Sequence, residues 1–175
     1  MTATAADPPQ ARGDTARPAP RRLLAAVIVL AVLAAAWWWA HPRTFDEPGN
    51  SMSVVGKVGT PTYLGLAFVP ATESIHLVDA SARVLFNDAQ ADVRVAVCRQ
   101  DDSLLGAAKG ADLESQCTSV RPPEGRVDGL DVLVVEVVAH APGTVIVEGL
   151  DVTYRTPYQR GTQTTGMAAA VVFER

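Results

Sequence analysis

The chain has 175 residues, of which 48% are hydrophobic and 19% are charged. Beyond residue 40 it holds 11 Lys and Arg (15 less the four earlier arginines) and 17 Asp and Glu (19 less two earlier aspartates), a net charge of −6. An acidic domain without clustered cations excludes nucleic acid as the expected partner. The strong excess of Arg over Lys, together with abundant Ala, favours a bacterial source with a GC-rich genome.

Residues 1–22 contain several prolines and lack the large apolar side chains that a core needs, so we expect a disordered tail. This segment carries four arginines, whereas the cations that first follow residue 40 are fewer and are diluted by acidic residues. By the positive-inside rule, the tail is cytoplasmic and the chain beyond residue 40 is extracytoplasmic.

The stretch Leu23–Ala40 reads LLAAVIVLAVLAAAWWWA and contains no charged residue, Pro or Gly. A helix of this length would measure about 27 Å, close to the ~30 Å hydrocarbon core of a bilayer. The three tryptophans at its end suit the depth of the lipid headgroups. We therefore expect one transmembrane helix over residues 23–40, which acts as a signal anchor and is the protein's contact with the membrane.

Three other interpretations of this stretch remain open. A cleaved signal peptide would use Ala34–Ala36 as its small-residue cleavage site. Arg21 and Arg22 before an apolar run also fit a twin-arginine export signal. The third interpretation is a buried helix of a soluble protein, although the run has no polar face.

Residues 41–52 are rich in turn-forming residues, and we expect a linker there. Over residues 53–175, short Val-rich runs alternate with Gly, Pro, Asp and Asn, a pattern typical of an all-β domain. We expect an antiparallel immunoglobulin-like β-sandwich of about seven or eight strands. The expected strands are Val54–Val58, Tyr63–Val69, Ser74–Val78, Ala82–Phe86, Asp92–Cys98, Leu130–Ala139, Thr144–Tyr154 and Met167–Phe173.

Two of the expected strands have informative patterns. Leu130–Ala139 is apolar on both faces, which favours a central position in a sheet and leaves Glu136 on a partly solvated face. Thr144–Tyr154 changes the phase of its apolar residues at Gly149, so we expect a bulge or bend there.

Cys98 and Cys117 are the only cysteines in the chain. An isolated pair in an oxidising compartment forms a disulfide, which we expect here; two unpaired thiols are the alternative. Cys98 ends the alternating strand Asp92–Cys98 on the face opposite its valines, a good position to tether the following chain. Residues 99–126 form a long stretch without a clear strand pattern, which is either functional or simply held by the disulfide.

Motifs that carry chemistry are missing from the sequence. The three histidines, His41, His76 and His140, share no zinc or metalloprotease spacing, and the nucleophile motifs Gly-x-Ser-x-Gly and Ser-x-x-Lys do not occur. The similar sequences VDGLDV (127–132) and VEGLDV (147–152) lack the dense oxygen ligands of a calcium loop. We therefore expect no cofactor, no metal site and no enzymatic activity.

Near the C-terminus, polar side chains surround a turn that contains Pro and Gly. We expect Arg155, Tyr158, Arg160 and Gln163 to lie on a loop that forms a contact surface, because Tyr and Arg are favoured at binding hot spots.

The sequence thus predicts a non-catalytic binding or accessory protein of the bacterial cell envelope, whose partner is another envelope or membrane protein. An envelope enzyme or metal carrier with a scattered site, and a structural subunit of an integral membrane complex, are the alternatives.

Overall fold

The computed structural model describes residues 20–40, 44–45, 49–70, 75–100, 107–109 and 112–175. The chain divides into two compact units, residues 1–38 and 39–175. The first contains most of helix α1 (Pro20–Ala40), whose residues 23–40 are long and apolar enough to span a membrane. Pro20 suits the first turn of a helix because that turn needs no donor from its N–H. The helix therefore begins within the expected tail, of which residues 1–19 lie outside the described part.

The second unit is built from strands, with one short helix, α2 (Asp112–Gln116). The strands are β1 (Ser51–Lys57), β2 (Thr62–Phe68), β3 (Ile75–Asn87), β4 (Asp92–Arg99), β5 (Ala107–Lys109), β6 (Ser119–Arg121), β7 (Gly125–Val127), β8 (Asp131–Val138), β9 (Gly143–Arg155), β10 (Arg160–Thr165) and β11 (Ala168–Glu174).

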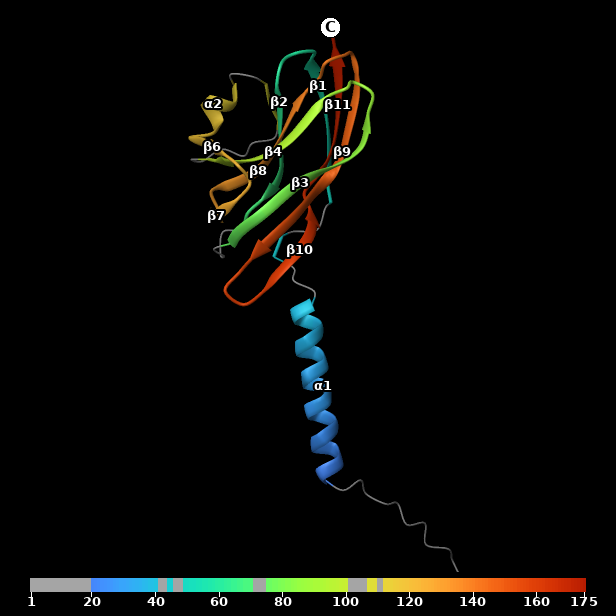
Figure 1. Ribbon diagram of the computed structural model, residues 1–175, viewed down its shortest axis with the longest axis vertical. Coiled ribbons are helices and arrows are strands. Elements are labelled where there is room, and N and C mark those ends of the chain that lie inside the picture. Colours follow the sequence, from blue (N-terminus) through green and yellow to red (C-terminus); the bar gives the residue numbers. More distant parts are fainter. Residues whose placement is uncertain (1–19, 41–43, 46–48, 71–74, 101–106, 110–111) are drawn as a thin grey trace, which may run out of the picture. The chain divides into compact units, whose positions relative to one another are not determined.

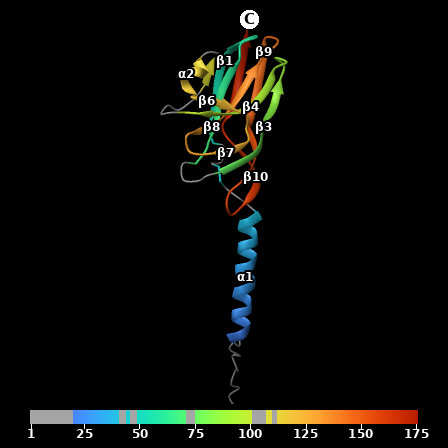
Figure 2. The ribbon, with the colours of Figure 1, turned by 60° about the vertical axis from the view of Figure 1, so that its left-hand side comes forward.

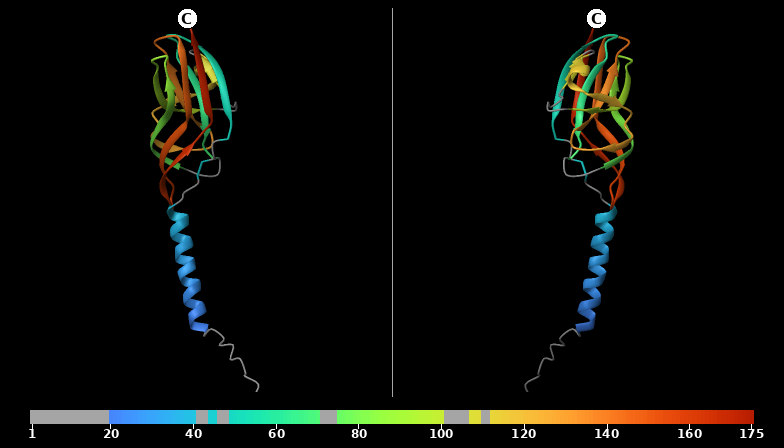
Figure 3. Two further views of the ribbon diagram at one scale, coloured as in Figure 1. Left: turned by 90° about the vertical axis from the view of Figure 1, so that its right-hand side faces the viewer. Right: turned by 90° about the vertical axis from the view of Figure 1, so that its left-hand side faces the viewer.

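These strands form two sheets that pack in a sandwich-like arrangement (Figure 1). The larger sheet has the order β1-β11-β9-β3-β7, with β10 also paired to β9, and the smaller sheet has the order β5-β2-β8-β4-β6. Long strands β3 and β9 run side by side through the larger sheet (Figure 3). Strand β8 lies at the centre of the smaller sheet, as the apolar pattern of residues 130–139 predicts.

The inward faces of the two sheets share one apolar core. Alternation places Val93, Val95 and Val97 of β4 on this core face, and β9 contributes its residues in two phases on either side of Gly149. Most of the largest fully buried side chains belong to this core, among them Tyr154, Leu64, Leu66, Ile75, Leu77, Leu133 and Leu150.

Several predicted strands differ from those observed. The two runs expected at 74–78 and 82–86 belong to one long strand, β3, because its bulges change the phase of the pattern without ending the pairing with β9. The 99–126 segment contains the three-residue strands β5, β6 and β7, which are too short to show a period. Strand β1 begins at Ser51, within the expected linker.

The sheets are not wholly antiparallel. Strand β1 pairs with β11 in parallel along all seven residues. The expected antiparallel direction is wrong for this pair, because β1 and β11 lie at opposite ends of the domain sequence. No short turn joins them, so connectivity does not impose an antiparallel direction.

The predicted irregularity at Gly149 is a β-bulge. Strand β3 advances from Ala82 to Val84 while its partner β9 passes from Leu150 to Val147, so β9 holds one extra residue. Gly149 has a φ of 138°, and a Cβ atom there would lie 2.7 Å from the carbonyl oxygen of Thr165. Only glycine fits this position without strain.

We expect Gly149→Ala to destabilise the domain by about 2–4 kcal/mol, because it combines an unfavourable φ with a backbone clash. Gly59→Ala is the matched control: Gly59 has a φ of 76°, but a Cβ atom there meets nothing within 4 Å, so its cost should stay near about 1 kcal/mol. Urea unfolding of the full chain in detergent micelles measures both. Equal losses would show that the approach to Thr165 does not matter.

Candidate functional site

The two cysteines are brought together as predicted. Cys98 lies at the end of β4 and Cys117 directly follows α2, and their sulfur atoms are bonded, with the Cα atoms 5.4 Å apart. Both are buried in a small second core with Leu113, Val132 and Val134, on the face of the smaller sheet opposite the main core. Helix α2 and β6 lie together on one side of the domain (Figure 2). The disulfide therefore fastens α2 to this face.

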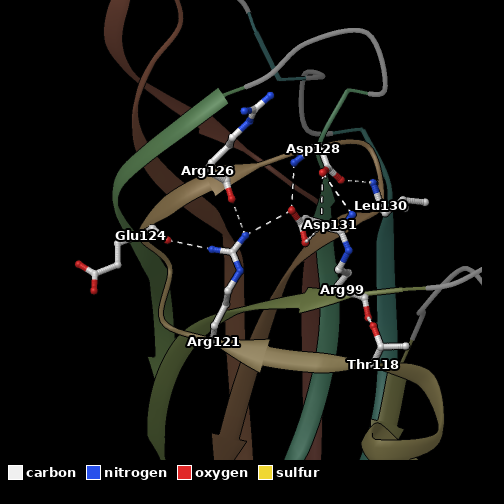
Figure 4. A network of polar contacts seen from close by, with 8 residues as sticks. All are labelled: Arg99, Thr118, Arg121, Glu124, Arg126, Asp128, Leu130 and Asp131. Carbon is white, nitrogen blue, oxygen red and sulfur yellow. Dashed lines mark hydrogen bonds and ion pairs between the residues drawn. The ribbon is translucent and has the colours of Figure 1, made fainter.

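A buried aspartate, Asp131, lies at the centre of a network of polar contacts (Figure 4). Asp131 begins β8, and its side chain has no exposed surface. Its Oδ2 accepts the backbone N–H of Asp128 at 3.0 Å and lies 3.3 Å from Nη2 of Arg121. Its Oδ1 lies 3.6 Å from Nη1 of Arg99. A buried carboxylate needs such partners, because burying an unpaired charge is costly.

The same arginines continue the network outward. Arg99 contacts Oδ2 of Asp128 through both terminal nitrogens, at 3.2 and 3.3 Å. Arg121 donates to the backbone carbonyl oxygens of Glu124 at 2.9 Å and Arg126 at 2.7 Å. The network thus joins the ends of β4, β6, β7 and β8, and it orders the chain on both sides of the disulfide.

Neighbouring donors hold Asp128 in its charged form. The N–H of Leu130 donates to its Oδ1 at 3.1 Å, and the Arg99 guanidinium is beside it. The backbone donor chiefly, and then the arginine, lower the pKa of Asp128 below its usual range. This lowered pKa stabilises the fold at neutral pH, and the contribution is lost as the pH falls through the range in which Asp128 is protonated.

The local sequence pattern does not reveal this network. Asp128 and Asp131 lie in the VDGLDV sequence, which predicts no calcium loop together with Glu148 and Asp151 of the similar VEGLDV sequence. The last two residues contact a different cation, Arg83, at 3.2 and 3.8 Å. The sequence feature that indicates this network is Asp131, an acidic residue at the start of an otherwise apolar central strand. An acidic side chain buried at that position needs a polar partner.

Glu136 lies in a row that crosses the outer face of the smaller sheet. It pairs in register with Tyr63 of β2 and with Arg94 of β4. The Tyr63 hydroxyl donates to Oε1 of Glu136 at 2.8 Å. Glu136 is half-buried, in agreement with the predicted partly solvated face. Burial and then the neighbouring carboxylate raise the pKa of Tyr63 to about 12.

The predicted contact surface falls on the β9–β10 hairpin. Arg155 and Arg160 face each other at its end, and Tyr158 at the tip is 73% exposed. The loop expected there is shorter than predicted, because residues 160–165 form a strand. The polar side chains of this strand show no apolar period, because among the described strands β10 pairs with β9 alone.

Gln163 has a different environment from the other three residues. Its Oε1 accepts the N–H groups of Thr44 at 3.0 Å and Phe45 at 3.1 Å, and its Nε2 donates to the Phe45 carbonyl oxygen at 2.6 Å. The Phe45 ring is 4% exposed and stands edge-on to Tyr154, with centroids 5.4 Å apart. Gln163 therefore holds part of the expected linker against the end of the core.

The remaining polar groups do not converge on one point. His140 pairs with Asp92 at 3.1 Å, and His76 is exposed on β3. In the described part of the chain, no group of three or more His, Cys, Asp or Glu side chains is placed to hold a metal ion. Comparison with models of known families and with curated protein sequences finds no match.

We expect Asp131→Asn to cost about 3 kcal/mol of unfolding free energy, because it leaves two arginines without their buried counter-charge. Asp128→Asn is the control: that side chain is 47% exposed, and we expect less than about 1 kcal/mol. Denaturant unfolding of the full chain with its disulfide intact compares the two. Similar losses would mean that burial of Asp131 is not what makes the network stabilising.

In an ultraviolet pH titration, Tyr63 should ionise with its raised pKa of about 12. Glu136→Gln should move this pKa down toward 10, the ordinary value of tyrosine, whereas Glu148→Gln should not change it. Because the folded pKa is the higher one, the stabilising effect is complete below pH ~10 and is lost as the pH rises toward ~12. An unchanged pKa in Glu136→Gln would contradict the assigned pair.

Proposed function

We propose that this chain is a single-pass, membrane-anchored protein of the bacterial cell envelope, which acts by binding through an extracytoplasmic β-domain. The observation that carries this proposal is helix α1. Its large aliphatic side chains and its three tryptophans are all more than half exposed. A continuous apolar surface of this length is unfavourable in water, and a bilayer would cover it.

The direction of insertion is supported by charge and by the disulfide. Four arginines precede residue 23, so the positive-inside rule favours a cytoplasmic N-terminus. Cys98 and Cys117 pair in a buried position, and such pairs persist in oxidising compartments outside the cytoplasm. The two sheets, which are mostly antiparallel, support an immunoglobulin-like type of sandwich for this domain.

A binding role is supported by the way polar groups are used. The buried charges neutralise one another and join strand ends, so they serve the fold. In contrast, the β9–β10 hairpin presents Arg155, Tyr158 and Arg160 to solvent. Exposed Tyr and Arg on a hairpin supported by regular pairing are suited to contact with a protein partner.

One labelling experiment tests both the compartment and the contact surface. In Tyr158→Cys the new residue is the sole free thiol of the described part, because the native cysteines are paired. A membrane-impermeant maleimide should label it in spheroplasts, but more slowly than in the purified protein because a partner covers the hairpin. Leu85→Cys, at a site that is 62% exposed on β3, should label at equal rates in both samples.

The possible outcomes separate the two halves of the proposal. If neither variant is labelled in spheroplasts, but both are labelled in inverted vesicles, the extracytoplasmic location is wrong. If Cys at position 158 reacts in spheroplasts as fast as in the purified protein, the location holds and the hairpin is not a covered contact surface.

A further inference from the structure

Strand β1 is an exposed sheet edge without the usual protection. Of the other strands that end the two sheets, β5, β6 and β7 have three residues each, whereas β1 has seven; β10 has six, but it begins with the charged Arg160 and binds residues 44 and 45 through Gln163. Part of β3 also lacks a partner on one side, but its register shifts three times and it carries Asp79 and Arg83. Short length, bulges and charges all discourage pairing with another chain. From Ser51 to Gly56, β1 has none of these features.

The hydrogen bonds to β11 show which backbone groups of β1 are free. Ala168 N–H donates to Asn50 O at 3.0 Å, and Val58 N–H donates to Glu174 O at 3.0 Å. In a parallel ladder, alternate residues of a strand bond to the same neighbour. The even-numbered residues of β1 therefore face β11. Ser51, Ser53 and Val55 direct their N–H and C=O groups away from it, and these groups have no backbone partner among the described residues.

The side chains next to this edge are small and uncharged. Ser51, Ser53 and Val55 are exposed on the outer face of the larger sheet. In register on β11 they neighbour Ala168, Ala170 and Val172. A shallow depression runs over this area, lined by residues 51–53, 168–170 and Ile146. On the other face of β1, Met52 and Val54 pack only partly against the core.

We propose that β1 pairs with β1 of a second copy of this chain, antiparallel and centred on Ser53. In this register Ser53 faces its own counterpart and Ser51 faces Val55, each pair exchanging both of its backbone hydrogen bonds. On the core side, Met52 meets Val54 of the partner, so two partly exposed apolar side chains become covered.

The charge pattern of the strand is compatible with a second copy as the occupant, and its free backbone groups and apolar residues match their own counterparts in this register. Lys57 is the one charged residue of β1, and in this register it falls opposite Gly49, beyond the end of the partner strand. No lysine therefore faces a lysine. The strand can thus pair with itself without like-charge repulsion, with its apolar residues and its free backbone groups opposite one another, and the pairing joins two copies of the larger sheet into one.

Cysteine crosslinking of the full chain in detergent micelles tests the register. Ser53→Cys should form a covalent dimer under mild oxidation, because the two Cα atoms would lie about 5.5 Å apart. Ser51→Cys alone should not, but should crosslink when mixed with Val55→Cys. Val172→Cys is an exposed control one strand inside the edge and should remain monomeric. Equal crosslinking of all these variants would indicate random collision and overturn the proposal.

A second variant tests the pairing without added cysteines. Ser53→Lys places two like charges opposite each other, and we expect it to weaken dimerisation by about tenfold or more in sedimentation equilibrium. Val172→Lys should leave the dimer intact. An unchanged thermal midpoint in both variants shows that they fold. A wild-type chain that stays monomeric at every concentration, or binds only an added extended peptide at β1, would show that self-pairing is wrong.

Discussion

The pairing of β9 with three other strands is the constraint on which the β-domain depends. β9 bonds to β3 along one side and, along the other, first to β11 and then to β10. The apolar residues of β9 change phase at Gly149. In a regular strand, those on one side of Gly149 would therefore point away from the core. The extra residue at Gly149 corrects the phase, so Val145 and Val147 on one side and Val152 and Tyr154 on the other all remain buried.

At one end of this strand, Tyr154 also contacts the segment of residues 44 and 45 that precedes β1. Phe45 packs on its ring, and Gln163 of the adjoining β10 binds the backbone of residues 44 and 45. The hairpin that presents Tyr158 is therefore supported by the same residues that hold this segment. Its tip is exposed, whereas its base belongs to the core, a combination that suits a binding surface on a rigid support.

The disulfide and the Asp131 network act on the opposite sheet. The covalent bond fixes α2 over β4 and β8, and the two arginines gather the ends of β4, β6, β7 and β8 around one carboxylate. Through Cys117, Arg99 and Arg121, both features fasten residues 99–126, the stretch with the weakest strand pattern, to β4 and β8. Short strands contribute little apolar burial, so a crosslink and a buried, ion-paired carboxylate supply the order that hydrophobic packing does not.

Local pattern was sufficient for the apolar helix, the β-class of the domain, the central position of β8, the cysteine pair and the bulge at Gly149, because each depends on composition or on a period of a few residues. The parallel β1–β11 pair, the single strand β3, the polar strand β10 and the partners of Asp131 and Gln163 were decided by tertiary structure. β10 pairs with its chain neighbour β9, but its polar residues show no apolar period; the others join residues distant in the chain, whose approach depends on how the whole sheet closes.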